Sequence, residues 1–165
     1  MIEERLTKSE RAGITRLEIL RRVKAMVSLL QLEKFELSLL LTTDDQVHEL
    51  NKIYRGKDRP TDVLAFAMRE GEFAGLAGDL LGDVIVSIPT ARRQAKERSV
   101  EALSEVTMLV AHGLLHLLGW DHETAAKDRA MRAETARLCA AAGENRPRRA
   151  AKRGSAATKK RITKG

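Results

Sequence analysis

Apolar residues recur with a helical period in some stretches of the chain and alternate as in a strand in others. In residues 15–31 they are spaced by three or four positions, which predicts an amphipathic helix. Residues 35–41 begin with alternation and become wholly apolar, a pattern typical of a strand that enters a buried sheet. Shorter apolar runs predict further strands, and periodicity with capping residues predicts further helices. The strands are expected at 63–66 and 80–87, and the helices at 45–54, 89–98, 100–118 and 124–141.

The order of these elements indicates an α+β domain, in which a small mixed β-sheet is covered by helices. The pair Thr43 and Asp44 is expected to cap the helix that follows it. Two segments have no assigned element. Residues 1–13 fit either a weak edge strand or a loose segment, and residues 70–78 indicate a glycine-rich, mobile loop.

Charge divides the chain into a nearly neutral body and a basic tail. The whole chain carries a formal charge of +7. Residues 143–165 hold nine basic residues and one acidic residue, so that residues 1–142 carry a net charge of −1. We therefore expect one domain over 1–142 and a disordered tail over 143–165. The tail fits either an arm that binds nucleic-acid phosphates or a solubilising extension without a specific partner.

Cysteine content and hydropathy indicate the compartment. Cys139 is the single cysteine, so the chain cannot form an intrachain disulfide and suits a reducing cytosol. No apolar run approaches the roughly 18 residues that a membrane-spanning helix needs. The first residues are acidic and lack the apolar stretch of a signal peptide. We expect a cytoplasmic protein without a membrane partner.

Three of the four histidines lie within one short run, at His112, His116 and His122. On an α-helix the first two project from one face, about one turn apart. Gly119 can end that helix in a left-handed conformation, so that the chain turns back and brings the third histidine to the same point. Three neutral imidazoles without a fourth protein ligand describe a catalytic zinc-type site with one open position. A histidine-rich helix cap is the alternative.

The spacing of these histidines also resembles the long zinc-binding consensus of the metzincin peptidases. Those enzymes place a glutamate, their general base, directly after the first histidine. In this chain the position is Gly113. A peptidase with this motif would lack its base, so the motif favours a metal site without favouring peptide hydrolysis.

A second group of candidate residues lies in the segment 54–66, just before and within a predicted strand. Its cations are Arg55, Lys57 and Arg59. An arginine fork can hold a phosphate through two hydrogen bonds, which makes the segment a candidate phosphate clamp. Asp58 and Asp62 would orient the arginines or shape the loop. Without the histidines, the segment also fits an ordinary charged turn.

The two segments together resemble the bacterial YbeY family of endoribonucleases that mature ribosomal RNA. The resemblance covers roughly residues 30–142. It rests on Tyr-Arg-Gly-Lys-Asp-Arg-Pro-Thr-Asp-Val-Leu-Ala-Phe at 54–66, Gly-Asp-Val-Ile-Val-Ser at 82–87 and His-Gly-Leu-Leu-His-Leu-Leu-Gly-Trp-Asp-His at 112–122. It implies a zincin-like metal-hydrolase core and one divalent metal ion, Zn²⁺, held by the three histidines of the last motif. It also implies a catalytic role for Arg55.

The resemblance further implies hydrolysis of single-stranded RNA, maturation of the 3′ end of the small-subunit (16S) ribosomal RNA, and a part in ribosome quality control. The implied partners are ribosomal RNA and the small ribosomal subunit, and a ribosomal protein or a ribosome-associated GTPase would deliver the substrate. Lys57 and Arg59 would then bind RNA beside Arg55. Two alternatives stay open: a zincin-type metallopeptidase, and a ribosome-assembly factor that binds RNA without cleaving it.

In such an enzyme the metal ion would polarise a phosphoryl oxygen or lower the pKa of its bound water, and Arg55 would stabilise charge on the phosphate. Asp121 lies beside the third histidine and fits two roles. It would accept a ring N–H from a ligand histidine, or it would cap the turn after Trp120. The sequence identifies neither the general base nor the nucleophile, which is water or the 2′-hydroxyl of the substrate.

Overall fold

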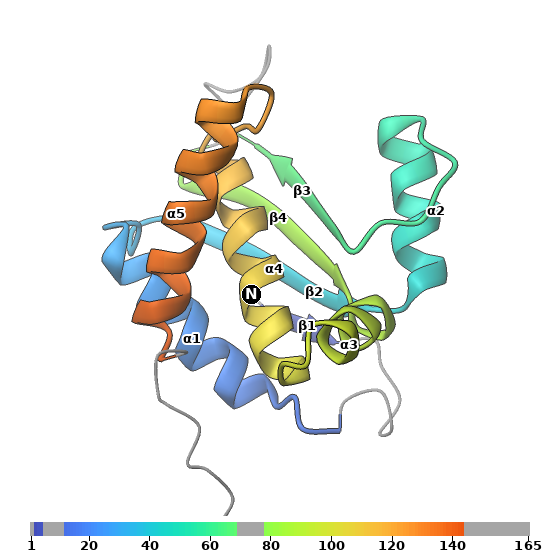
Figure 1. Cartoon of the computed structure of the whole chain (residues 1–165). Helices are drawn as coiled ribbons and strands as arrows, with labels where there is room; N and C mark the ends of the chain where they lie inside the picture. The colour runs from blue at the N-terminus through green and yellow to red at the C-terminus, as the bar shows by residue number, and fades with distance from the viewer. Residues whose placement is uncertain (1, 5–11, 69–77, 144–165) are drawn as a thin grey trace, which may run out of the picture.

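The computed structural model describes residues 2–4, 12–68 and 78–143 and contains one four-stranded sheet (Figure 1). The strands are β1 Ile2–Glu4, β2 Glu36–Thr42, β3 Val63–Ala67 and β4 Leu80–Ser87. They lie in the order β1-β2-β4-β3. β2 runs parallel to both of its neighbours, whereas β3 pairs antiparallel with β4. The sheet is therefore mixed, and within the described chain β3 forms one of its edges.

Five helices complete the described part of the fold, close to the predicted positions. They are α1 Arg16–Leu29, α2 Asp44–Arg55, α3 Ile88–Glu97, α4 Ala102–Leu117 and α5 Ala125–Ala141. The predicted α+β class, with a small mixed sheet and helices around it, is confirmed. The edge-strand alternative for the N-terminal segment is confirmed for Ile2–Glu4, which pairs with β2. Residues 5–11, the predicted glycine-rich loop except its last residue, and the tail after Gly143 lie outside the described residues.

Most of the core lies on one face of the sheet, where α1, α4 and α5 pack (Figure 1). Val84 and Val86 of β4 point into this core, whereas Ile85 between them points to the opposite face, as the alternation of a strand requires. On that opposite face α2 covers the sheet through a smaller cluster formed by Val47, Leu64 and Ile85. The sheet thus has one heavily covered face and one face covered mainly by α2.

α4 packs unusually close to the sheet at Gly113. A Cβ atom at this position would lie 2.7 Å from Cγ1 of Val84 and 3.3 Å from Cγ2 of Val63. Only a residue without a side chain lets the helix backbone approach β3 and β4 this closely. The contact fixes the height of α4 above the sheet, and with it the position of the residues on the other sides of the helix.

The predicted cap of α2 is wrong in its chemistry. Thr43 occupies the N-cap position, but its side chain makes no capping hydrogen bond. The Asp44 carboxylate instead accepts hydrogen bonds from Ser87, from Thr90 at 2.6 Å and from Arg93 at 2.9 Å. These partners lie at the end of β4 and on α3, so they became available only through the tertiary fold. The acidic residue therefore joins α2 to α3.

No single helix of the described chain is long and apolar enough to cross a membrane. α3 and α4 meet that criterion of length and composition only when taken together, across a bend of 115°.

Candidate metal centre

Two histidines project from the same side of α4, one helical turn apart. His112 and His116 lie at positions i and i+4, and their Nε2 atoms are 3.2 Å apart. Both side chains are half-buried, because this side of α4 forms the floor of a cleft. The helix thus presents two nitrogen donors at a fixed separation.

α4 ends in a Schellman motif, which turns the chain back over the helix end. Gly119 has a φ of 80°, and its N–H donates to the carbonyl of His116 at 3.0 Å. The N–H of Trp120 donates to the carbonyl of Leu115 at 3.1 Å. The left-handed glycine predicted at this position is confirmed. The turn brings the ring of His122 to within 5.4 Å of the His116 ring, measured between centroids.

The three histidines form a donor set that fits a divalent metal ion. One nitrogen of each lies within 4.8 Å of the other two. Tetrahedral zinc, with Zn–N bonds of about 2.0–2.1 Å, separates its ligand nitrogens by about 3.3 Å. The 3.2 Å between His112 and His116 matches this value, and His122 lies on an exposed turn that can approach them. Among the described residues no cysteine or carboxylate joins the group. A catalytic site, with one position left open, fits this arrangement better than a closed structural site.

Burial favours the protonation state in which these histidines bind metal ions. Burial lowers the pKa of His112, and the neighbouring His116 and His122 lower it further. The pKa of His116 is lowered by burial and by His122 as well. A neutral imidazole has a free lone pair for a metal ion. The backbone of Trp120 acts in the opposite direction and raises the pKa of His116.

Arg55, the last residue of α2, reaches over the edge of the sheet toward the histidines. Its guanidinium donates a hydrogen bond to the carbonyl of Ala65 on β3 at 2.7 Å and lies 5.6 Å from the centre of the Phe66 ring. It lines the same cleft as the histidines, and its charge contributes to the lowered pKa of His116. The structure therefore brings the arginine of the first motif to the histidines of the second.

The loop after α2 carries Lys57 and Arg59 along the wall of this cleft. Gly56 ends α2 with a φ of 65°, in the left-handed region. Buried Asn51 then holds the loop. Its side-chain amide donates to the carbonyl of Arg59 at 2.7 Å, and its backbone carbonyl accepts the N–H of Lys57 at 3.2 Å. Both cationic side chains are exposed to solvent, so a bound anion can reach them.

The two aspartates of this segment shape the loop and do not orient the arginines. Asp58 accepts hydrogen bonds from Lys52 and His48, both at 2.8 Å, and these two partners hold its pKa below the usual range. Asp62 accepts a hydrogen bond from Gln94 at 2.9 Å and a second one from the backbone of the next residue. Of the two roles expected for the aspartates, only the structural one is found. The remaining histidine of the chain, His48, lies on α2, where it binds Asp58 of this loop and does not join the other three histidines.

The contacts of Asp121 fit the second of its two expected roles, the one that shapes the turn after Trp120. Asp121 accepts hydrogen bonds from the N–H of Glu123 at 3.1 Å and from Lys127 at 2.6 Å, and Lys127 lowers its pKa. Within the described chain, none of the three histidines donates to it. Asp121 thus ties the turn before His122 to the first turn of α5.

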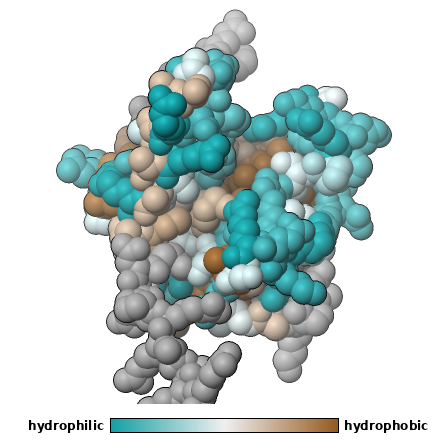
Figure 2. Space-filling model, in the orientation of Figure 1, coloured by the Kyte–Doolittle hydropathy of each residue, from teal (hydrophilic) through white to brown (hydrophobic). Residues whose placement is uncertain are grey.

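These groups line one cleft of about 750 Å³, bounded by α4, β3 and the loop after α2. In Figure 2 it is the hollow between the hydrophilic surface over α2 and the surface over α4 and α5, with apolar surface in its floor. The sequence analysis missed Arg98, which also lines the cleft. Arg98 follows the short helix α3 and belongs to no motif, so nothing in the sequence distinguishes it from other exposed arginines.

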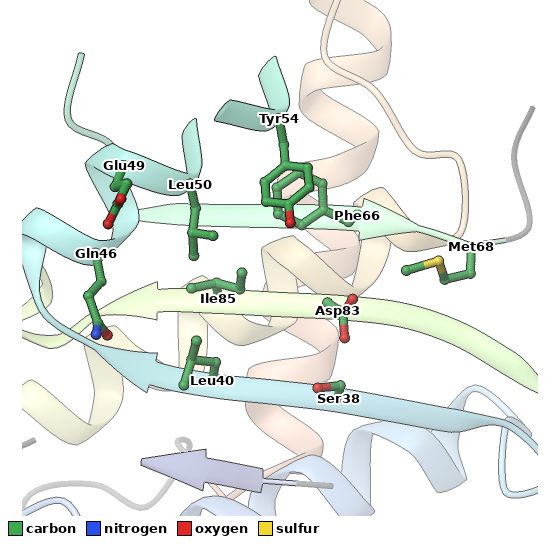
Figure 3. A pocket seen from close by; sticks show the side chains of 10 residues that line it. All are labelled: Ser38, Leu40, Gln46, Glu49, Leu50, Tyr54, Phe66, Met68, Asp83 and Ile85. Atoms are coloured by element: carbon green, nitrogen blue, oxygen red, sulfur yellow. The ribbon is translucent and has the colours of Figure 1, made fainter. Parts of the chain in front are cut away.

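A second hollow, of about 510 Å³, lies under α2 on the other face of the sheet (Figure 3). We call it the α2 groove. Tyr54 and Phe66 form an edge-to-face pair in it, with centroids 5.5 Å apart, and the aliphatic side chains of α2, β2 and β4 complete its floor. Its charged side chains are the carboxylates of Glu49 and Asp83, and none of the described residues that line it is basic.

Comparison with known proteins gives the same family throughout. A family model described as Endoribonuclease YbeY matches residues 5–143. The Endoribonuclease YbeY of Synechocystis sp. is 45% identical over 119 residues, which are 68% of this chain and 66% of the relative. That of Aquifex aeolicus is 45% identical over 118 residues, which are 72% of this chain and 77% of the relative. The match thus spans just under two thirds of the length of the first of these relatives.

A solved structure has a similar fold. The solution structure of TM1509 from Thermotoga maritima superposes with a TM-score of 0.58 at 25% sequence identity, covering 86% of this chain and 89% of that one. The fold, the two motifs and the sequence matches agree. The chain belongs to the YbeY endoribonuclease family.

Proposed function

We propose that this chain is a metal-dependent endoribonuclease that hydrolyses single-stranded RNA. The observation that carries the proposal is the convergence of His112, His116 and His122 in one cleft with Arg55. A metal-binding donor set next to a guanidinium suits the cleavage of a phosphodiester, because both groups stabilise negative charge on phosphate oxygens. Relatives that share 40–54% of their aligned residues with this chain carry the name Endoribonuclease YbeY, which supports an RNA substrate.

Different residues of the cleft would have different roles in such a reaction. The three histidines would hold one divalent ion, which we propose to be Zn²⁺, and that ion would supply Lewis acidity and an activated water. Arg55 is held between the Ala65 carbonyl and the Phe66 ring, so its remaining N–H groups have a defined direction for binding a phosphate. Lys57 and Arg59 lie farther along the loop and would bind neighbouring phosphates of the strand.

Peptide hydrolysis is disfavoured by the packing of α4. The residue after the first histidine, Gly113, faces Val84 and Val63 of the sheet at a distance that leaves no room for a side chain. A general base cannot be placed there without moving the helix. Cationic side chains also line the cleft, and they match a polyanionic substrate better than a neutral peptide.

We further propose the biological setting that the family resemblance implies. The substrate would be the precursor of the 16S ribosomal RNA 3′ end in the cytoplasm, and the enzyme would act in maturation and quality control of the small ribosomal subunit. A ribosomal protein or a ribosome-associated GTPase would bring the two together. The family match of residues 5–143 and the cationic wall of the cleft support this setting.

The proposed function is tested by metal analysis and RNA product mapping on one preparation of the protein. We expect about one equivalent of zinc and internal cleavage of single-stranded RNA that stops after chelation. A 2′,3′-cyclic phosphate on the products would identify the 2′-hydroxyl as the nucleophile, whereas a simple phosphate end would indicate water. RNA binding without cleavage by the metal-loaded protein would instead support an assembly factor. Degradation of casein would support a peptidase.

A further inference from the structure

The cleft continues past the histidines along α4. Met108, His112 and His116 follow one another at four-residue intervals, so they line one face of the helix. Beyond them a further hollow of about 600 Å³ opens between α4 and α5, and it shares Arg98, Met108, His112 and His122 with the cleft. The two hollows therefore form one continuous groove, which we call the α4 groove, and the histidines lie along its course.

Two arginines line the α4 groove beside different turns of α4. The charge of Arg55 lowers the pKa of His116, which lies in the last turn of α4. Arg98 forms an ion pair with Glu105, which lies in the first turn. Positions 105 and 116 are eleven residues apart, which corresponds to about 16 Å along a helix. This length exceeds the reach of a single phosphate group. We therefore expect an RNA strand that contacts both arginines to do so through different phosphates.

Arg98 is held in place by a buried carboxylate. Its Nη1 atom donates to Oε1 of Glu105 at 2.7 Å. The Glu105 side chain is 3% exposed, whereas that of Arg98 is 55% exposed. A guanidinium has five N–H donors, and among the described residues Glu105 is the hydrogen-bond partner of this side chain. One side of the guanidinium is thus anchored, and the half-exposed side chain lines the groove.

The cost of burying Glu105 indicates that the pair does more than stabilise the fold. Burial raises the pKa of the Glu105 carboxyl, although Arg98 acts in the opposite direction. Buried ion pairs commonly contribute no more to stability than apolar residues of similar size would. If the pair served only to stabilise the junction of α3 and α4, apolar residues could replace it. Apolar residues could not replace an arginine that is fixed in direction to bind a phosphate.

We propose that Arg98 is a substrate-binding residue, which binds a phosphate of the RNA strand beside the first turn of α4, away from Arg55. The strand would then run along α4, with the scissile phosphate at the histidines and a flanking phosphate at Arg98. This inference rests on the proposed RNA substrate and adds the direction of the strand. It also assigns a role to a side chain outside both sequence motifs.

The first test replaces Arg98 and measures RNA binding and cleavage in the full-length protein. We expect Arg98→Ala to raise KM for a long single-stranded RNA about tenfold, as the loss of a charge-assisted hydrogen bond does, with kcat within about twofold of the unchanged protein. Arg98→Lys should recover part of this loss. The slope of log affinity against log salt concentration should fall by about 0.7, the value for one phosphate contact with a single strand. A short RNA that lacks the flank on the Arg98 side should be cleaved equally well by both proteins.

Two further variants separate binding from folding. Arg98→Ala leaves Glu105 buried without a partner and can lower stability. The double variant Arg98→Met with Glu105→Leu replaces the pair by apolar groups, and it should fold, retain zinc and show the same loss of affinity and salt slope. Arg137→Ala removes an exposed arginine of a similar ion pair on α5, outside the groove, and should leave both quantities unchanged. Unchanged affinity and salt slope in the double variant would overturn the inference.

The RNA affinities of the Arg98 variants are also measured in a His116→Ala background, where binding is measured without cleavage. These measurements keep the inference about Arg98 distinct from the proposed function. If the metal-loaded protein binds RNA but cleaves none, the proposed activity fails while the salt slope still reports on Arg98. If cleavage occurs and Arg98 has no effect on affinity, salt slope or flank dependence, the activity stands and the proposed strand direction is wrong.

Discussion

The two faces of β3 border hollows of similar size and opposite chemistry. Val63, Ala65 and Ala67 point into the cleft that holds the histidines and cations, whereas Phe66 points into the α2 groove with its carboxylates (Figure 3). In the cleft four cationic side chains outnumber the carboxylates of Asp62 and Asp121, so a negatively charged strand is attracted there and repelled by the α2 groove. Arg55 belongs to the helix that covers the groove, yet it crosses the sheet edge to the cleft. The contrast shows that the sign of the charge, and not the presence of a cavity, separates the candidate active site from its neighbour.

The largest effect is expected from removing a metal ligand, which should make the cleft as inactive toward RNA as the α2 groove. His116→Ala should lose stoichiometric metal together with at least about a hundredfold of the cleavage rate, because two imidazoles hold an ion less tightly than three. Elemental analysis and RNA cleavage on one preparation check this. His48→Ala is the matched control, since His48 bonds Asp58 outside the cleft, and it should retain both properties. Full metal occupancy in the His116 variant would remove that residue from the ligand set.

The next largest effect concerns the arginine that crosses between the two faces. Arg55→Ala should reduce kcat about a hundredfold or more, as the loss of a charge-stabilising donor does in other enzymes, while the metal content stays the same. Lys52→Ala removes a cation of the same helix that pairs with Asp58, and it should have little effect. Kinetics of cleavage and metal analysis measure the difference. Equal rates for the two variants would refute the phosphate-binding role of Arg55.

An intermediate effect, on stability, should follow from disturbing the contact between α4 and the sheet. Gly113→Ala places a Cβ atom 2.7 Å from Val84 and should destabilise the protein by roughly 1–3 kcal/mol. Val84→Ala makes room for it, so the double variant should lose less stability than the two single variants combined. Denaturant unfolding of the four proteins completes this cycle. Strict additivity would mean that the close approach does not limit the position of α4.

The smallest effect is expected on the other side of β3. Glu49→Gln removes a carboxylate from the α2 groove and should change the free energy of unfolding by no more than about 0.5 kcal/mol. RNA affinity and cleavage by the purified protein should stay within about twofold. A strong gain in RNA affinity would show that the carboxylate repels a strand that passes close to the groove, and the two faces would then be less separate than the structure indicates.

Local geometry made the histidine cluster predictable from the sequence. The four-residue spacing of His112 and His116 and the left-handed turn at Gly119 depend only on helix geometry, so the sequence predicts them without a tertiary structure. The motif at residues 54–66 identified Arg55, but it did not predict that the side chain reaches across β3 to the Ala65 carbonyl. The hydrophobic period likewise gave the five helices and the buried strands, because each depends on residues that are neighbours in the chain.

Contacts between distant segments were the part that the sequence did not reveal. Thr43 fits a capping residue in isolation, but the carboxylate next to it is bound by residues of β4 and α3. Asp58 fitted either a partner of the arginines or a residue that shapes the loop, and only its contacts with Lys52 and His48 decide for the loop. Arg98 comes to the cleft only because α3 and α4 fold back on each other. In each case the partner is chosen by the tertiary arrangement, which periodicity and motifs do not encode.

The unequal mounting of the three imidazoles has a kinetic consequence. Two of them stand on a rigid helix, whereas His122 stands on a solvent-exposed turn that Asp121 and Lys127 tether. The contact between Asp121 and Lys127 should therefore control how fast a bound ion exchanges. Lys127→Ala should speed release of the ion to a chelator while leaving His112 and His116 in place on α4. The residues that follow α4 should therefore set how long the metal ion stays bound, as well as how tightly it binds.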